Sequence, residues 1–278
     1  MGILKNKLLC TDKPNVKYTR SVLEKFSDEE IEYIKDNIVE ITGGRESVST
    51  METTMVRRTI GHLANQSDLN KYALVAEFLQ TIIARNNDFE QNHLFLNLEE
   101  NSAKKGFDGL FKKNGEIWLL ESKSTKVSTP PKNGPTHALT IGKSYNGLKD
   151  MLAGGSGKTK SEYDPWTNAA HHVFASHSKD HKSLRIQLDQ LSKDYLERKY
   201  ETIDKCNVII ASTVVCDDLQ TINVSIDKLN KYIETHESKE EIISLLDLQN
   251  EDIFYELLDS ILTVDDVCLG EGEGENNE

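Results

Sequence analysis

The dipeptide Asn114-Gly115 separates two apolar runs, 107–111 and 117–120, and constrains the fold more than any other feature of the sequence. Asn-Gly between such runs is the strongest short-range signal for a two-residue β-hairpin turn. A turn of this length fixes the pairing of its strands, so Asp108 is predicted to face Glu121. The sequence therefore predicts a hairpin with one acid on each strand at the end away from the turn.

Alternation of side chains along a strand divides this hairpin into two faces. Lys123 follows Glu121 by two residues, so we expect it on the same face as Asp108 and Glu121. Leu110 and Leu119 would share that face nearer the turn, and the opposite face would hold Phe107, Phe111, Trp118 and Leu120. Both faces are apolar enough for a strand pair inside a sheet.

Two carboxylates that face each other repel, and the pair destabilises a sheet unless another group compensates. Protonation of one acid or the ammonium of Lys123 would compensate, but a divalent cation is the stronger candidate. Carboxylate oxygens suit Mg²⁺, which normally keeps several waters and takes a substrate phosphate oxygen. With Lys123 beside such a cation, the hairpin predicts metal-assisted hydrolysis of a phosphodiester.

Hydrophobic periodicity and turn residues predict the other elements. The order around the hairpin is helix, three strands, helix, strand, which indicates an α/β fold. The expected helices are 21–41, stopped by Gly43-Gly44, 67–86 with Ser67-Asp68 as its N-cap, 183–200, 225–236 and 238–262. The expected strands beside the hairpin are 92–98 and the β-branched run 206–215.

Composition divides the chain into four segments. These are an N-terminal helical or mixed region 1–66, a core 67–218, C-terminal helices 219–268 and an acidic tail 269–278. Within the core, residues 124–182 are rich in Pro, Gly, Ser, Thr and Lys, and we expect a long insertion with one short helix near 140–152. The tail is too polar and Gly-rich to pack, so it is expected to be disordered.

Asp108, followed on the next strand by Glu121-Ser122-Lys123, resembles the motif of the PD-(D/E)xK nuclease superfamily. The resemblance covers about residues 67–216, and Gly106-Phe107 stand where the name-giving proline would be. It implies a restriction-endonuclease-like core, a mixed central sheet flanked by helices, here with helical N- and C-terminal additions. It also implies a DNA nuclease that depends on Mg²⁺, for which Mn²⁺ can substitute.

The resemblance assigns a role to each matching residue. It implies that Asp108, Glu121 and the backbone carbonyl of Ser122 bind the metal, and that Lys123 is the catalytic lysine. Glu77 matches a further acid that family members often take from their first helix, although a solvated glutamate is the alternative. The alternative for the whole site is a structural ion cluster in a non-catalytic nucleic-acid-binding or assembly subunit that retains the fold.

The short motif alone is not specific, because it occurs elsewhere in the chain. Asp180-His181-Lys182, Glu197-Arg198-Lys199 and Glu237-Ser238-Lys239 also fit it, the last with the identical tripeptide. All three lie in polar or helical surroundings without a facing acid. The hairpin context therefore distinguishes Glu121-Ser122-Lys123.

A narrower resemblance concerns the chain length, the sequence segments KGFDGL and IWLLESK, and the stretch 177–191. These features are similar to the HamA family, the nuclease subunits of the bacterial Hachiman anti-phage defence systems. The similarity implies a helicase partner of the HamB type, which would restrain the nuclease until damaged or invading DNA is sensed.

The charge of the chain is unevenly distributed. The formal net charge is −13, but residues 101–200 hold 17 Lys and Arg against 10 Asp and Glu. Phosphate contacts need only reach and positive charge. Candidate DNA contacts in this basic segment are Lys143, Lys149, Lys158, Lys160 and Arg185. Gln187 and Lys193 lie on the same predicted helix as Arg185 and are further candidates.

Other signals in the sequence are weaker. Residues 153–159 approach a phosphate-binding loop, but Leu152 replaces its first glycine and a helix precedes it where a strand is required. Histidines between 171 and 181 lack the partners of a zinc motif, and the four cysteines form no CxxC pair. With no signal peptide and no long apolar run, we expect a cytoplasmic protein.

Overall fold

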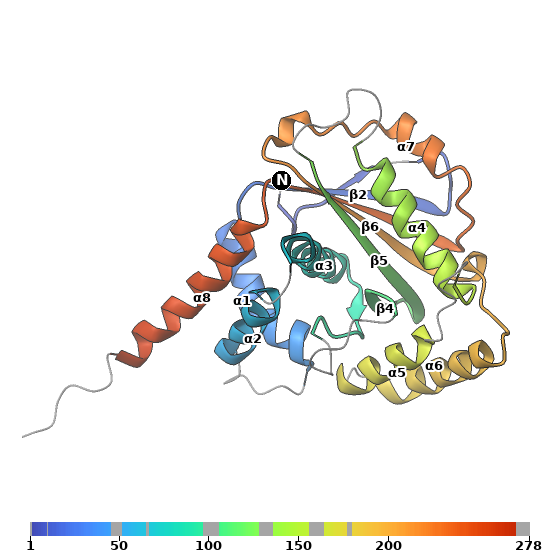
Figure 1. The fold of residues 1–278 in the computed structure, drawn as a ribbon, viewed down its shortest axis with the longest axis horizontal. Helices are drawn as coiled ribbons and strands as arrows, with labels where there is room; N and C mark the ends of the chain where they lie inside the picture. The colour runs from blue at the N-terminus through green and yellow to red at the C-terminus, as the bar shows by residue number, and fades with distance from the viewer. Residues whose placement is uncertain are drawn as a thin grey trace, which may run out of the picture.

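The computed structural model describes residues 2–9, 11–45, 52–64, 67–96, 106–127, 136–155, 164–176 and 180–270. They form an α/β fold in which a mixed sheet of seven strands has helices on both faces (Figure 1). The predicted class and the helix-flanked mixed sheet are thus confirmed. None of the described helices is long and apolar enough to cross a membrane.

The sheet has the strand order β1-β2-β7-β6-β5-β4-β3. Strands β2, β7, β6 and β5 pair in parallel, whereas β1 with β2, β5 with β4 and β4 with β3 pair antiparallel. The strands are β1 (Lys7–Leu9), β2 (Val16–Leu23), β3 (Glu90–Gln91), β4 (Gly109–Lys113), β5 (Glu116–Lys126), β6 (Asn207–Val215) and β7 (Glu240–Leu248).

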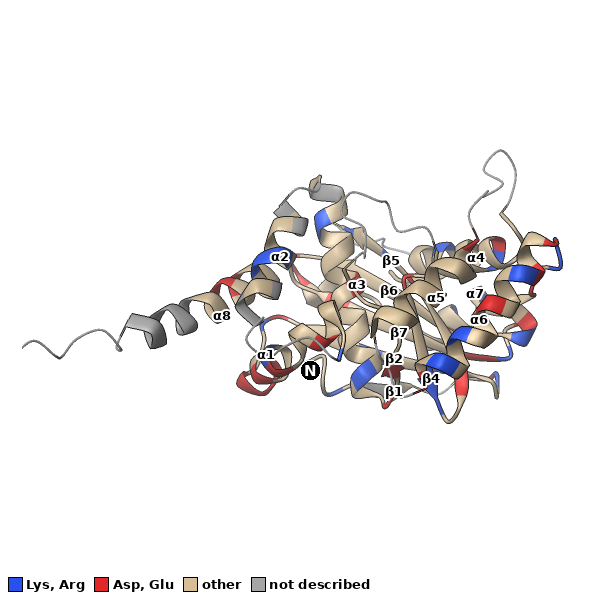
Figure 2. Cartoon of the chain, turned by 90° about the horizontal axis from the view of Figure 1, so that it is seen from below, with Lys and Arg blue, Asp and Glu red and all other residues tan. Residues whose placement is uncertain are grey.

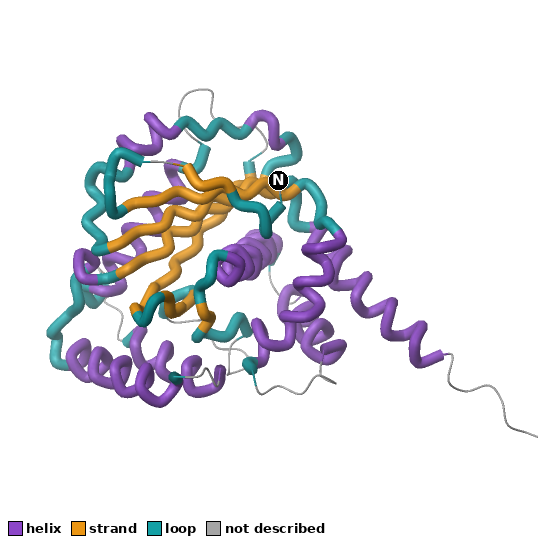
Figure 3. The backbone as a smooth tube through the Cα atoms, turned by 180° about the vertical axis from the view of Figure 1, so that it is seen from behind, coloured by secondary structure: helices purple, strands orange, loops and turns teal. Residues whose placement is uncertain are grey.

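Helices α3 and α4 cover opposite faces of this sheet (Figures 1 and 3). Ala84 of α3 packs with Leu120 and Ile209 on one face, and Ile141 of α4 packs with Leu119 on the other. The described helices are α1 (Asp28–Gly43), α2 (Glu52–Ala64), α3 (Asp68–Asn86), α4 (Ala138–Leu152), α5 (Pro165–Ser176), α6 (His181–Leu196), α7 (Ile226–Tyr232) and α8 (Asp252–Gly270).

The hairpin has the predicted turn and register. Asn114 and Gly115 have φ angles of 52° and 82°, as a turn of type I′ requires. Phe111 faces Trp118, and the β4–β5 ladder ends where Gly109 faces Leu120, one residue short of Asp108. The predicted face of Phe107 is wrong. Phe107 lies outside the ladder, where alternation no longer determines the face of a side chain, and it packs with Leu110 and Leu119.

The predicted strand 92–98 is wrong as placed. The strand is β3, only Glu90–Gln91, because the chain then turns toward α1, where the Phe95 N–H donates to the Ile41 carbonyl at 3.0 Å. Residues 97 and 98 lie outside the described part of the chain.

The expected insertion 124–182 contains a principal helix of the core. β5 continues to Lys126, and α4 packs on both β5 and β6, so α4 is the helix that covers the hairpin strand. Helix α6, near the predicted helix 183–200, packs instead on α5, which the sequence analysis did not predict. Polar composition was misleading here because α4 buries Ser144 and Thr140 against the sheet.

The terminal segments are not purely helical additions. Residues 240–248, predicted as helix, form β7, and the first residues of the predicted helix 21–41 belong to β2. Both strands lie in the same sheet as β5 and β6. Helix α1 ends at Gly43, and Gly44 with φ 91° caps it, as predicted. The predicted disordered tail overlaps α8 at residues 269 and 270, and its remainder, 271–278, lies outside the described residues.

Candidate active site

The end of the hairpin brings Asp108 to the edge of β5. Because β4 begins only at Gly109, the ladder does not extend to Ser122, and β4 offers no backbone partner for the Ser122 N–H. Oδ2 of Asp108 accepts this N–H at 2.8 Å. The carboxylate thus caps the sheet edge and is held beside the Glu121-Ser122-Lys123 segment.

Lys123 contacts both predicted acids. Its Nζ lies 2.5 Å from Oε1 of Glu121 and 3.8 Å from Oδ2 of Asp108, and it donates to the Ser122 carbonyl at 3.1 Å. Asp108, Glu121 and Lys123 therefore lie together, as the hairpin register predicts. The Lys123 side chain is 39% exposed, so the cluster is open to solvent on the lysine side.

Glu121 is the perturbed member of the cluster. Burial, followed by the charge of Asp108, raises the pKa of Glu121 to about 8, although Lys123 acts in the opposite direction. Oε2 of Glu121 is buried and has no hydrogen-bond partner among the residues that the structure describes. Burial lowers the pKa of Lys123, but the carboxylates around it outweigh burial, and the net shift is upward. Burial and the charge of Asp108 therefore favour the protonated form of Glu121, and Lys123 opposes them.

Glu77 approaches the cluster from the other layer. It lies on α3, buried, and its charge contributes to raising the pKa of both Glu121 and Lys123. The helix places this acid near the site, as the sequence analysis proposed.

The raised pKa of Glu121 predicts how stability depends on pH in the presence of chelator. Between its usual pKa of 4.5 and about 8, Glu121 binds more protons in the folded than in the unfolded state. The free energy of unfolding should therefore fall as pH rises through this window, by a few kcal/mol at most. Urea unfolding at a series of pH values measures it.

Glu121→Gln is the control for this pH dependence, because the amide keeps the shape of the carboxyl group and does not titrate. The variant should remove most of the decline between pH 4.5 and 8. An unaltered decline in Glu121→Gln would mean that other groups cause it.

Helix α4 covers Glu121, a contact that the sequence analysis missed. Oγ of Ser144 donates to the Glu121 carbonyl at 2.5 Å. At Gly147, an added Cβ would lie 3.5 Å from Oε1 of Glu121, so the glycine leaves room beside the carboxylate. The sequence signal for this contact is that the small residues Ser144 and Gly147 lie at helical spacing from Ile141 and Leu148.

The donor set suits a hard divalent cation. Asp108 and Glu121 supply carboxylate oxygens, and Oε2 of Glu121, which has no partner in the described part of the chain, is available as a ligand. Within the described residues, no group of three or more His, Cys, Asp or Glu is assembled closely enough to hold an ion. Lys123 lies between the two acids and offsets part of their negative charge.

Comparison with family models, with curated proteins and with solved structures finds no match. The function of this site is therefore inferred from its geometry and from the resemblance in its motif.

The other (D/E)xK segments have different surroundings. Lys239 pairs with Glu116 at 2.8 Å rather than with Glu237, which pairs with Lys149 at 3.1 Å. Lys199 pairs with its own motif partner Glu197 at 2.7 Å, and both side chains are exposed. These are surface ion pairs, and none resembles the half-buried cluster at Lys123.

The predicted DNA contacts are only partly described. Lys143 is exposed on α4, whereas Lys149 pairs with Glu237 and Arg185 pairs with Asp189 at 3.6 Å. Lys158 and Lys160 lie outside the described residues. Basic and acidic residues alternate on α6 instead of forming one basic face (Figure 2).

The two competing motifs gain no support. Residues 138–152 are helical where a phosphate-binding loop requires a strand, and residues 156–159 lie outside the described part. His172 is buried and stacks on His93 with ring centroids 3.6 Å apart, while His171 is exposed. His177 lies outside the described residues.

Proposed function

We propose that this chain is a Mg²⁺-dependent nuclease that hydrolyses DNA phosphodiester bonds. The supporting observation is the contact of the Lys123 ammonium with two carboxylates, one of them buried with an oxygen that no described residue hydrogen-bonds. Such a cluster is costly for a fold. Clusters of perturbed titratable groups are typical of functional sites.

Each residue has a role in this proposal. Asp108, Glu121 and the Ser122 carbonyl would hold Mg²⁺ or Mn²⁺, with Glu77 as a further acid from α3. The bound cation would polarise the phosphate and lower the pKa of a water. Lys123, on the open side of the cluster, would orient the attacking water and stabilise negative charge on the phosphate. Asp108 also fixes the Ser122 N–H and thereby the edge of β5.

The proposal predicts a strict metal requirement. The purified chain is expected to degrade DNA with Mg²⁺ or Mn²⁺ and to stop when excess chelator is added, because the acids need a cation to act on a phosphodiester. Labelled single- and double-stranded DNA, assayed by gel electrophoresis, measures this. Cleavage that continues in chelator would contradict the metal site.

A second candidate is a non-catalytic nucleic-acid-binding or assembly subunit. The position of Lys123 between the acids favours it, because the lysine offsets part of their charge without a metal ion. The two candidates differ in thermal unfolding with added Mg²⁺. A nuclease should be stabilised by the ion, and Asp108→Ala should lose that stabilisation. A non-catalytic subunit should show neither effect.

We further propose that the enzyme acts in bacterial anti-phage defence as the cytoplasmic partner of a helicase. The resemblance to HamA supports this, as does a net charge of −13, which makes intrinsic DNA affinity weak and leaves delivery of substrate to a partner. Lys143 and the other basic candidates would then contribute auxiliary backbone contacts. Co-purification from the native host should recover a helicase.

A further inference from the structure

A row of polar side chains, buried except for the partly exposed Arg20, crosses the sheet beside the candidate site. Ser212 Oγ lies 2.8 Å from Nδ1 of His137, and Nε2 of His137 lies 2.7 Å from Oδ1 of Asp247. Arg20 completes the row by donating from Nε to Oδ2 of Asp247 at 2.9 Å. Because an ionised carboxylate only accepts hydrogen bonds, Nε2 of His137 donates to Asp247.

Serine, histidine and aspartate are the residue types of a hydrolase triad, but their burial excludes that chemistry. Ser212, His137 and Asp247 are each 0% exposed, so no substrate carbonyl can reach the Ser212 hydroxyl. Buried polar networks of this kind rigidify and specify a local arrangement.

Strand register places the network next to Lys123. Ser212 on β6 is the direct partner of Lys123 on β5, so both side chains leave the sheet on the same face. Ser212 also hydrogen-bonds the Thr140 hydroxyl, and Thr140 Oγ1 donates to the His137 carbonyl at 2.9 Å. Ser212 thus joins the strand beside Lys123 to the first turn of α4.

Helix α4 connects this first turn to Glu121. Ser144, one turn beyond Thr140, donates to the Glu121 backbone, and Gly147 faces the Glu121 carboxylate. A displacement of the first turn would therefore alter the packing around Glu121.

We propose that Ser212 and Thr140 are positioning residues, which act with His137 and Asp247 to fix α4 over Glu121 and Lys123. The catalytic part of this inference rests on the proposed nuclease function. Misplacement of reacting groups by about 1 Å costs about 100-fold in rate, so loss of the network should lower kcat more than it raises KM.

Paired substitutions at Thr140 test the inference. Thr140→Val removes the hydroxyl at nearly constant shape, and Thr140→Ser keeps it. With Mg²⁺ and DNA, Thr140→Val and Ser212→Ala should lower kcat about tenfold or more with KM changed less than about twofold, and Thr140→Ser should restore most of the rate. Hydrogen exchange of amides 138–152 should accelerate in the first two variants but not in Thr140→Ser.

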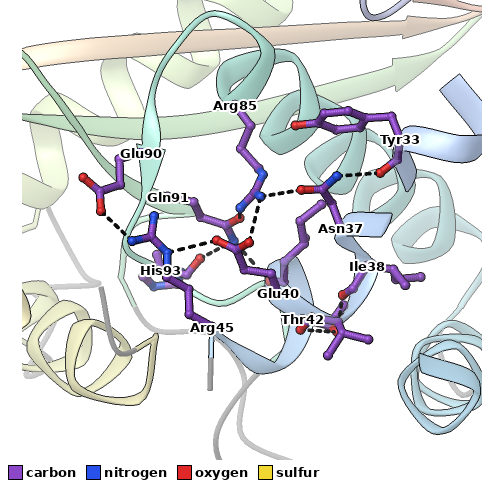
Figure 4. Close-up of polar contacts among 12 residues, drawn as sticks. Tyr33, Asn37, Ile38, Glu40, Thr42, Arg45, Arg85, Glu90, Gln91 and His93 are labelled. Atoms are coloured by element: carbon purple, nitrogen blue, oxygen red, sulfur yellow. Dashed lines mark hydrogen bonds and ion pairs between the residues drawn. The ribbon is translucent and has the colours of Figure 1, made fainter. Parts of the chain in front are cut away.

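A polar cluster away from α4 provides the control. Arg85 of α3 donates to Asn37 at 2.8 Å and to Gln91 at 3.1 Å, and it pairs with Glu40 at 3.4 Å (Figure 4). Arg85→Met should lower stability through the same loss of a partly buried network. It should leave both kcat and the exchange of α4 unchanged.

The outcomes separate the two proposals. Unchanged exchange in α4 with unchanged kcat in Thr140→Val would overturn the positioning role. An equal loss of kcat in Arg85→Met would also overturn it, because the cause would be general destabilisation. If the wild-type chain cleaves no DNA, the nuclease proposal fails. Hydrogen exchange alone then tests the positioning role of Thr140. Faster exchange in Thr140→Val but not in Thr140→Ser then supports the role, and equal exchange refutes it.

Discussion

Lys123→Ala is expected to lower the rate of metal-dependent DNA cleavage by on the order of 100- to 1,000-fold, the usual loss when a single charge-stabilising donor is removed. Its Nζ contacts Glu121 and the Ser122 carbonyl and lies on the open side of the cluster. Removing the ammonium also removes an interaction that lowers the pKa of Glu121, so this acid becomes harder to ionise. Single-turnover cleavage of labelled DNA measures the loss.

The chain contains a matched control for this substitution. Lys239 ends the same tripeptide, Glu237-Ser238-Lys239, but forms a surface pair with Glu116. Exposed pairs contribute about 0–1 kcal/mol, so Lys239→Ala should leave both stability and cleavage nearly unchanged. Equal rates for Lys123→Ala and the wild-type chain would refute the assignment of the catalytic lysine.

Asp247→Ala is expected to cause the largest loss of stability, about 3–5 kcal/mol of unfolding free energy, because it leaves His137 without its buried partner and removes the pairing of Arg20. Burial raises the pKa of Asp247, but His137 and Arg20 outweigh burial and hold it below its usual value. Its ionised form therefore stabilises the fold above about pH 4 and loses this effect on acidification. Urea unfolding at neutral pH measures the loss.

Glu237→Ala is the comparison for Asp247→Ala, since it also removes one acid from an ion pair. The Glu237–Lys149 pair is exposed, so the expected change is about 0–1 kcal/mol. Similar small losses for both variants would show that the Asp247 network contributes little to stability.

The hairpin and its acids could be predicted because one local rule determines them. A two-residue turn with positive φ at Asn114 and Gly115 fixes the register, and alternation then places Glu121 and Lys123 on one face. The same reasoning failed for Phe107, which lies beyond the last ladder pair, where alternation no longer applies.

Strand β7 could not be predicted from its own residues. The segment EEIISLLDL has apolar spacing that fits a helix or a strand. In the fold, β2 and β6 pair with it on both sides. Glu241 is buried against His236 and Ser238, and Asp247 against His137 and Arg20. The partners of Asp247 and the neighbouring strand β2 are distant in sequence, so no short sequence pattern predicts this strand.

The start of α1 was readable but was overlooked. Ser27 and Glu30 form a capping box, in which each side chain bonds the backbone of the other, and this motif marks the helix N-terminus. The capping box thus marks the boundary between the strand ending at Leu23 and the helix beginning at Asp28. The positioning contacts of α4 with Ser212 had no comparable signal, because they join segments 72 residues apart.

Strand β6 contacts both covering helices through neighbouring residues. Ser212 bonds to α4 on one face, and Thr213 accepts from Gln80 of α3, one turn after Glu77, on the other at 3.1 Å. Strand β6 thus helps to position both helices, which lie on opposite faces of the sheet. The spacing between Glu77 and α4 is consequently set by the thickness of the sheet, a dimension that substitutions on the outer surface of either helix leave unchanged.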